Sequence, residues 1–179
     1  MSHILQSDWF ARDTEAVARE LLGKTLCRQL SDKGVVRLTI NETEAYVGPH
    51  DSASHAHLNR FTKRTKTMFE VPGTLYIYLI YGMYWMLNIV TEQKDYPAAV
   101  LIRGASNDFL NLDGPGKLTR DLQIDKNLNN QILSKENNFL IEDSGMPVPE
   151  DKIISTPRIG INYASEPWLS APLRFLLSE

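Results

Sequence analysis

The chain has 179 residues, of which 42% are hydrophobic, a formal net charge of −3 and one cysteine, Cys27. This length suits one globular core, so we expect a single domain over residues 1–179 instead of two independent ones. The lone cysteine excludes an internal disulfide, and no run of about eighteen apolar residues predicts a membrane-spanning helix. We therefore expect a soluble, cytoplasmic protein. Its net charge gives no global sign of a nucleic-acid partner, so such a function would rest on a local patch.

The N-terminal part predicts a helix followed by a long strand. Residues 13–24, DTEAVARELLGK, place apolar side chains at helical spacing after a capping Asp13 or Thr14 and end at Gly23. Residues 35–49, VVRLTINETEAYVGP, alternate with period two before a Gly-Pro break, which is typical of a strand. In one uninterrupted strand, a single face would carry Val36, Leu38, Ile40, Glu42, Glu44 and Tyr46.

A polar loop is expected at residues 52–69, before an aromatic hairpin at residues 73–90, GTLYIYLIYGMYWMLNIV, which turns at Tyr81-Gly82. Each buried tyrosine hydroxyl needs a hydrogen-bond partner, so a tyrosine-rich strand often has one wet face. The pattern favours a flat, polar partner against this hairpin. Tyr76, Tyr84 and Trp85 are assigned to ordinary packing.

The C-terminal half predicts a strand at residues 98–104 and a short helix within residues 113–125. Residues 129–153 are polar and are expected on the surface, and short strands return at residues 158–163 and 173–177. Strands outnumber helices without a regular alternation of the two, which favours an α+β domain around a mixed or antiparallel sheet.

Glu42 and Glu44 allow more than one interpretation. The strand could leave the core at Asn41, with both acids solvated or in salt bridges. Alternatively, one acid lies in a polar pocket at the rim of the core and acts as a general base. Two neighbouring acids also raise the hypothesis of a glycosidase pair, although the sequence does not fix their separation.

The segment after this strand contains three histidines and a basic run. His50, His55 and His57 lack a cysteine partner and an HExxH spacing, so we expect no metal site. The basic run has no acid between Ser52 and Phe69 and is usually a solvated loop. Beside a carboxylate pair and an aromatic hairpin, it also fits a loop that contacts DNA phosphates. Its members are Arg60, Lys63, Arg64 and Lys66.

The stretch DGPGKLT at residues 113–119 is similar to the end of a phosphate-binding loop. It lacks that loop's first glycine, because position 111 is Asn, and Leu118 follows the lysine where Ser or Thr is required. A nucleoside triphosphate site is therefore excluded. A helix N-terminus with Lys117 in its first turn could still hold a phosphate of the DNA backbone.

Several longer motifs carry a specific resemblance. ETEAYVGPHDSASHA, MFEVPGTLYIYLIYGMYWMLNI, AAVLIRG, GPGKL and PRIGI with PLRF occur in the order and rough spacing of the alkyladenine (3-methyladenine) DNA glycosylase family. The resemblance covers nearly the whole chain. It implies a single α+β domain with a curved, mainly antiparallel sheet, flanking helices and a β-hairpin that protrudes into the DNA minor groove.

The resemblance also implies roles for individual residues. Glu44 matches the general base that activates water, and Arg103 matches the arginine that helps to hold that water. Tyr81 at the hairpin turn matches the wedge that fills the gap left in the duplex. The matches that line the pocket for the flipped base are Tyr46, His55, Tyr78 and Asn88, the last of which rejects guanine by crowding its amino group.

The implied activity is base excision repair of double-stranded DNA that contains alkylated or deaminated purines. A monofunctional enzyme would hydrolyse the N-glycosidic bond of 3-methyladenine or 7-methylguanine, with hypoxanthine and ethenoadenine as candidate further substrates. It would leave an abasic site, use no cofactor, lack lyase activity and act as a monomer. Two other classes stay open: a noncatalytic binder of single strands that uses the same rings and cations, and a carbohydrate-active enzyme that uses Glu42 and Glu44.

Overall fold

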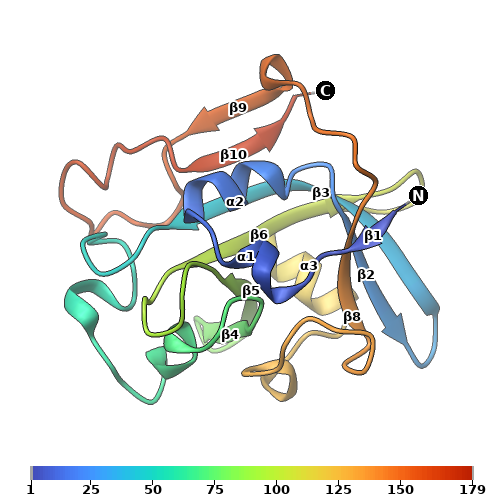
Figure 1. The fold of residues 1–179 in the computed structure, drawn as a ribbon, viewed down its shortest axis with the longest axis horizontal. Coiled ribbons are helices and arrows are strands. Elements are labelled where there is room, and N and C mark those ends of the chain that lie inside the picture. The colour runs from blue at the N-terminus through green and yellow to red at the C-terminus, as the bar shows by residue number, and fades with distance from the viewer. Residues whose placement is uncertain (1, 179) are drawn as a thin grey trace.

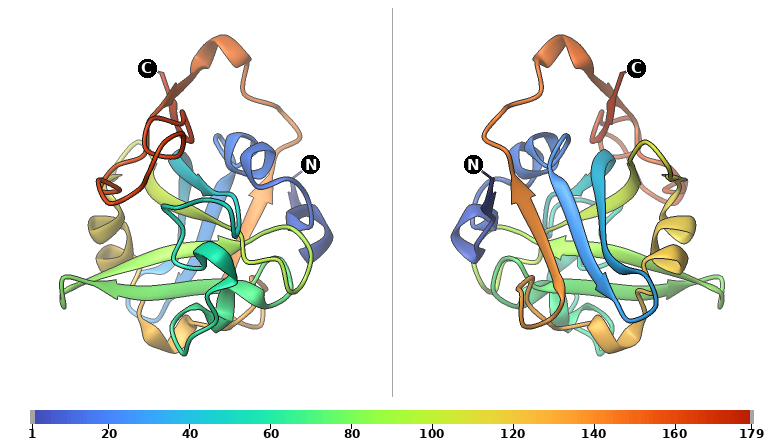
Figure 2. Two further views of the ribbon diagram at one scale, coloured as in Figure 1. Left: turned by 90° about the vertical axis from the view of Figure 1, so that its left-hand side faces the viewer. Right: turned by 90° about the vertical axis from the view of Figure 1, so that its right-hand side faces the viewer.

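A computed structural model describes residues 2–178 and contains a strongly curved ten-stranded sheet (Figures 1 and 2). All pairs of neighbouring strands are antiparallel in the order β1-β8-β2-β3-β6-β5-β4, while β10 joins β3 to β9, and β7 joins β6. The strands are β1 (His3–Ile4), β2 (Thr25–Leu30), β3 (Gly34–Tyr46), β4 (Leu75–Ile80), β5 (Tyr84–Val90), β6 (Ala99–Ser106), β7 (Asn111–Asp113), β8 (Phe139–Asp143), β9 (Ile153–Thr156) and β10 (Arg174–Leu177). The predicted α+β class with a mainly antiparallel sheet is confirmed.

Three short α-helices flank this sheet: α1 (Ser7–Phe10), α2 (Thr14–Glu20) and α3 (Pro115–Asp121). The predicted cap of α2 is present, because the Asp13 side chain accepts a hydrogen bond from the Ala16 amide at 2.9 Å. Figure 1 shows α2 lying over β3 and β6. No helix among residues 2–178 is long and apolar enough to cross a membrane.

The predicted loop at residues 52–69 contains two 3-10 turns, η1 (His57–Asn59) and η2 (Thr65–Phe69). Two more, η3 (Lys126–Leu128) and η4 (Glu150–Lys152), lie in the C-terminal half. The main core gathers apolar side chains from α2, α3 and most strands, so both larger helices pack on the same side of the curved sheet.

An irregularity between β3 and β6 decides which side chains face this core. Ile40 pairs with Ala105, Glu42 pairs with Gly104, and the register then moves on to Thr43 and Ile102. Asn41 on β3 and Arg103 on β6 are therefore both left out of the pairing, as in β-bulges. The strands approach closely here, because a Cβ atom on Gly104 would lie 2.5 Å from Asn41 Oδ1.

The bulge corrects the expectation of one shared face along β3. Leu38 and Ile40 lie in the core before it, and Ala45 takes the core side after it. Glu42, Glu44 and Tyr46 consequently point to the opposite face of the sheet. An extra residue shifts the two-residue alternation by one position, which turns every later side chain over.

Two other expectations are wrong. Residues 129–153 are not purely superficial, because they contain β8, which lies between β1 and β2 with Phe139 and Ile141 fully buried. The composition of this stretch is polar, but two alternating apolar side chains suffice to bury one face of a short strand. Residues 158–163 form turns instead of a strand, with Gly160 at a φ of +78°.

The predicted hairpin of β4 and β5 extends beyond the body of the molecule, as the left view of Figure 2 shows. Tyr81 and Gly82 have φ values of +53° and +71°, and the Met83 amide donates a hydrogen bond to the Ile80 carbonyl at 3.1 Å. These values define a type I′ turn, which matches the twist of the two strands. The Tyr81 side chain at its tip is 81% exposed.

Candidate active site

The candidate site lies on the sheet face opposite the helices. Glu44 of β3 is in register with Leu101 of β6, which is in register with Asn88 of β5, which in turn faces Tyr76 of β4. Paired residues of antiparallel strands share a face, so these four side chains form one row across four strands. Tyr46 and Tyr78 lie on the same face, two residues further along their strands.

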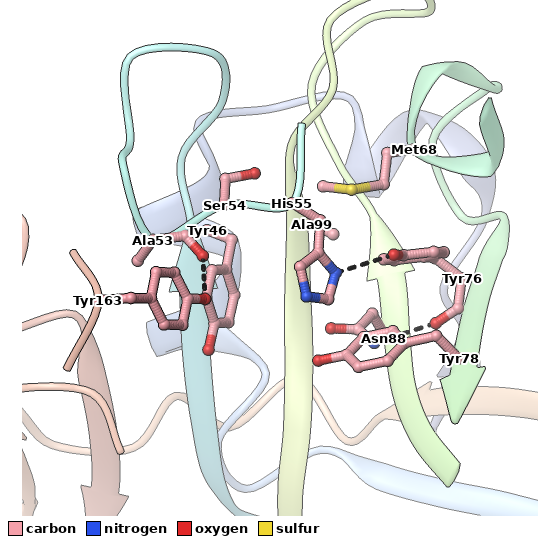
Figure 3. Close-up of a pocket in the computed structure, with 10 residues that line it drawn as sticks. All are labelled: Tyr46, Ala53, Ser54, His55, Met68, Tyr76, Tyr78, Asn88, Ala99 and Tyr163. Carbon is pink, nitrogen blue, oxygen red and sulfur yellow. Dashed lines mark hydrogen bonds between the residues drawn. The ribbon is translucent and has the colours of Figure 1, made fainter. Parts of the chain in front are cut away.

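Beside this row is a small cavity (Figure 3). Its water-accessible space is about 30 Å³, which holds on the order of one or two water molecules. The cavity is therefore narrow in the free protein. Its lining residues are Tyr46, Ala53, Ser54, His55, Met68, Tyr76, Tyr78, Asn88, Ala99 and Tyr163.

Glu44 is fully buried and surrounded by hydrogen-bond donors. The Tyr46 hydroxyl donates to Oε2 at 2.9 Å, the Ile159 amide donates to Oε1 at 2.8 Å, and Arg103 Nη1 lies 3.5 Å from Oε1. Burial raises the pKa of Glu44, while the charge of Arg103 and the two hydrogen bonds counteract that rise. Of the interpretation that both acids are solvated or salt-bridged, solvation is wrong for Glu44, whereas a contact with an arginine is present.

Glu42 has a different environment, although it is only two residues away. Its Oε1 atom accepts hydrogen bonds from Arg103 Nε and from Arg174 Nε, each at 2.7 Å. Two guanidinium groups thus compensate one carboxylate, which fixes the position of Arg103 between Glu42 and Glu44. A carboxylate held in this way is poorly suited to be the second acid of a glycosidase pair.

His55 and the tyrosines of β4 form one wall of the cavity. The Nδ1 atom of His55 lies 3.0 Å from the Tyr76 hydroxyl, and its ring centroid lies 4.6 Å from that of Tyr78. Burial, reinforced by the charges of Arg64 and Arg60, lowers the pKa of His55 to about 4, so the ring is neutral at pH 7. Tyr76, which the sequence assigned to packing, is thus part of this wall.

Asn88 lines the same cavity beside this wall, with 3% of its surface exposed. Its Nδ2 atom donates to the carbonyl oxygens of Tyr76 at 3.0 Å and Met86 at 3.4 Å. Both amide protons are thereby directed at the backbone. The side-chain oxygen is left free for a group that enters the cavity.

Sequence reasoning missed an ion pair behind the site. Asp51 and Arg158 are both buried and make a bidentate contact, with Arg158 Nη2 2.9 Å from Asp51 Oδ1. Arg158 also donates to the Ala45 carbonyl at 2.8 Å, and its Cζ atom lies 4.7 Å from the centroid of the Tyr46 ring. The pair supports Tyr46 from behind. Both residues occur within the quoted motifs, which was the only signal that could have found them.

Tyr163 is a second residue that the sequence left without a role. It comes from the loop after β9 and donates its hydroxyl to the Ala53 carbonyl at 2.8 Å. Figure 3 shows its ring beside Tyr46, on the side of the cavity away from Tyr78.

The candidate DNA-contacting residues lie around the cavity rather than in it. A groove of about 800 Å³ adjoins the cavity and is lined by Arg60, Lys63 and Arg64, while Lys66 is exposed nearby on the same loop. Lys117 differs from these residues, because its Nζ atom lies 2.5 Å from Asp113 Oδ1. Its charge is therefore already paired in the free protein.

The histidines do not gather. His50 contacts the ring of Trp168, with 5.4 Å between centroids, whereas His55 contacts Tyr76. Among residues 2–178, no group of three His, Cys, Asp or Glu side chains could hold a metal ion.

The site thus combines a buried carboxylate, an aromatic cavity and a basic groove. The chain matches the family model described as methylpurine-DNA glycosylase over residues 8–179. It belongs to this family, and the class of enzyme expected from the sequence, a DNA glycosylase of base excision repair, is confirmed.

Individual relatives agree with this assignment. A protein of Psychrobacter cryohalolentis is 37% identical over all of this chain and 94% of its own length. One of Methanocella arvoryzae is 43% identical over 92% of this chain and 90% of its own length. One of Rickettsia rickettsii is 46% identical over 90% of this chain and 85% of its own length. Their names assign all three provisionally as 3-methyladenine DNA glycosylases.

Proposed function

We propose that this enzyme removes 3-methyladenine and 7-methylguanine from double-stranded DNA by attack of a Glu44-activated water on the sugar. The observation that carries the proposal is the fully buried Glu44 carboxylate, which three donors hold beside an aromatic cavity. These donors favour the ionised form against the effect of burial. An ionised carboxylate in this position is a suitable general base.

The flipped base would stack between Tyr46 and Tyr78, with His55 at its edge. Alkylation at N3 of adenine or N7 of guanine makes the base cationic, so it stacks better on electron-rich rings than a neutral base does. Flipping also costs less at a damaged pair. Asn88 would crowd the 2-amino group of normal guanine, which excludes that base from the cavity.

The chemical step needs one proton acceptor. The water gives its proton to Glu44 as its oxygen bonds to C1′ of the sugar, and the C1′–N bond breaks with its electron pair moving to the base. An alkylated base is already a good leaving group, so no strong general acid is needed. Arg103, held by Glu42, would orient Glu44 and the water.

The product would be an abasic site without strand cleavage. None of the described residues that line the cavity is a lysine, and a Schiff base with the sugar requires an amine. We therefore propose a monofunctional hydrolase. Hypoxanthine and ethenoadenine are neutral, and their excision would depend on how snugly the cavity fits them.

Tyr81 would fill the gap that the flipped nucleotide leaves, because its exposed ring sits on a rigid turn. Arg60, Lys63, Arg64 and Lys66 would contact phosphates, and Lys117 would do so only after it leaves Asp113. The proposed enzyme acts as a monomer on DNA in the cytoplasm.

The test is incubation with methylated duplex DNA, followed by detection of released bases and of strand breaks. Free 3-methyladenine and 7-methylguanine, with strands that break only after alkaline treatment, are the expected result. Binding without release would instead indicate a noncatalytic binder. Strand breaks that form without alkali would indicate lyase activity.

A further inference from the structure

Arg64 differs from the other cations of the basic loop. Its Cζ atom lies 4.6 Å from the centroid of the Tyr78 ring, and its Nη2 atom lies 3.4 Å from Nε2 of His55. Arg60, Lys63 and Lys66 make no such contact within the part of the chain that the structure describes. Arg64 alone thus extends from the groove onto the wall of the cavity.

The guanidinium of Arg64 has the chemical character of the proposed substrate. It is planar and positively charged, and at this distance from a tyrosine ring it makes a cation–π contact. An alkylated purine is also flat and cationic and would use the same wall. A base that stacks on this wall must displace the guanidinium, because the Arg64 Cζ atom lies over the Tyr78 ring.

We propose that Arg64 is a specificity-determining residue, whose guanidinium occupies the Tyr78 wall in the free enzyme and must be displaced by the flipped base. This inference rests on the proposed glycosylase function. A cationic base replaces the contact that Tyr78 loses when Arg64 leaves, whereas a neutral base does not. The displaced guanidinium would then face the groove, where it can pair with a DNA phosphate whichever base is bound.

As a consequence, the enzyme would select flipped bases by their positive charge, which the shape of the cavity alone would not achieve. Arg64 makes neutral purines less favourable ligands without affecting cationic ones to the same degree. Removal of the Arg64 charge should therefore weaken the preference of the enzyme for cationic lesions over neutral ones.

The first test compares Arg64→Gln with Lys63→Gln. Glutamine keeps a flat polar group without the charge, and Lys63→Gln removes the same charge from the same loop outside the wall. The measurement is the ratio of kcat/KM for 7-methylguanine to kcat/KM for hypoxanthine in otherwise identical duplexes. This ratio should fall by about two- to fivefold in Arg64→Gln and stay unchanged in Lys63→Gln.

If the kcat/KM ratio in Arg64→Gln equals that in Lys63→Gln, Arg64 only contacts phosphate. That result would overturn the inference. Where the parent releases no measurable hypoxanthine, release by Arg64→Gln alone supports the inference. Continued absence of release from that variant counts against it.

The second test needs no activity, because it measures the pKa of His55 by NMR. Burial and the charges of Arg64 and Arg60 hold this pKa at about 4, and the ring also contacts the Tyr76 hydroxyl and the Tyr78 ring. The pKa should rise in Arg64→Gln and not in Lys63→Gln.

An unchanged pKa in Arg64→Gln would show that the guanidinium does not lie on the wall, and the inference would fail even in an active enzyme. A raised pKa in a protein that releases no base would refute the proposed function. In that case the position of Arg64 would still be established.

Discussion

Tyr76 and Tyr81 belong to the same hairpin, yet their surroundings are opposite. Tyr76 is 2% exposed and lies next to His55, and burial raises its pKa to about 12. Tyr81 is 81% exposed on the turn and contacts no part of the core. The inner end of the hairpin therefore serves the fold and the cavity together, whereas the side chain of Tyr81 at the tip is available for contacts outside the protein.

The largest expected effect is that of Glu44→Gln at the inner site. The change keeps size and removes the proton acceptor, so excision of 3-methyladenine should fall by at least the roughly 10² to 10⁴ typical of lost acid–base catalysis. Binding to lesion-containing DNA should survive. Single-turnover excision and a binding assay on the same duplex measure both properties.

Glu42→Gln is the matched control, because it removes a charge two residues away on the same face. It weakens the hold on Arg103 and Arg174 and should reduce excision less than Glu44→Gln does. An inactive Glu42→Gln beside an active Glu44→Gln would exchange the roles of the two acids, and the matched positions of the other site residues would have to be abandoned.

Tyr81→Ala at the tip should lower excision from duplex DNA by roughly five- to 150-fold, the equivalent of about 1 to 3 kcal/mol of lost stacking. Its free energy of unfolding should change by no more than about 0.5 kcal/mol. Tyr76→Ala should instead lose about 3 to 5 kcal/mol of stability, as buried aromatic truncations do. Thermal unfolding separates the two. A Tyr81→Ala variant that unfolds, or that excises as fast as the parent, would contradict the claim that Tyr81 acts on DNA and does not stabilise the fold.

The pH dependence of excision tests the role of Glu44 at the inner site. Burial raises the pKa of Glu44, and the base must be ionised, so activity should be lost as pH falls through a value above the ordinary 4.5. Tyr46→Phe removes a hydrogen bond that stabilises the carboxylate, so this acid limb should move to higher pH. Tyr76→Phe removes a cavity hydroxyl that does not contact Glu44 and should leave the limb in place. A shift to lower pH in Tyr46→Phe would contradict the assignment of Glu44 as the base.

The smallest effect concerns the basic loop. Nonspecific binding to duplex DNA should weaken steeply with salt, with a slope of roughly 0.9 in log affinity for each phosphate contact. Lys63→Gln should reduce that slope by about one contact. Lys117→Gln should reduce it less, because Asp113 already pairs that lysine. Binding that barely responds to salt would remove the loop from the interface.

Local patterns were sufficient for several parts of the fold. The cap at Asp13 and the turn at Tyr81-Gly82 are signals within a few residues, and both formed where they were predicted. The helix after Asp13 ends at Glu20, three residues before the predicted stop at Gly23, which has a φ of +79° in the turn that follows. Glu44 was also recognisable, because it belongs to a long motif that resembles a known family.

Other features have no local signal. Asn41 is polar and suits either face of a strand, so nothing in the alternation shows that it is left unpaired. The contact between Asp51 and Arg158 joins residues far apart in the chain, and only the folded sheet brings them together. Phe139 and Ile141 were hidden by the polar residues around them.

The bulges at Asn41 and Arg103 tie the length of two strands to the chemistry of the site. Deleting the paired residue Thr43 would turn Ala45 outward and drive Glu44 into the helix-packed core, whereas deleting the unpaired Asn41 would leave Glu44 on its present face. Deleting the unpaired Arg103 from β6 would likewise keep the alternation, but it would remove the guanidinium group that contacts Glu42 and Glu44. Insertions and deletions should therefore be tolerated in the loops of this enzyme, but not in the paired stretches of β3 and β6.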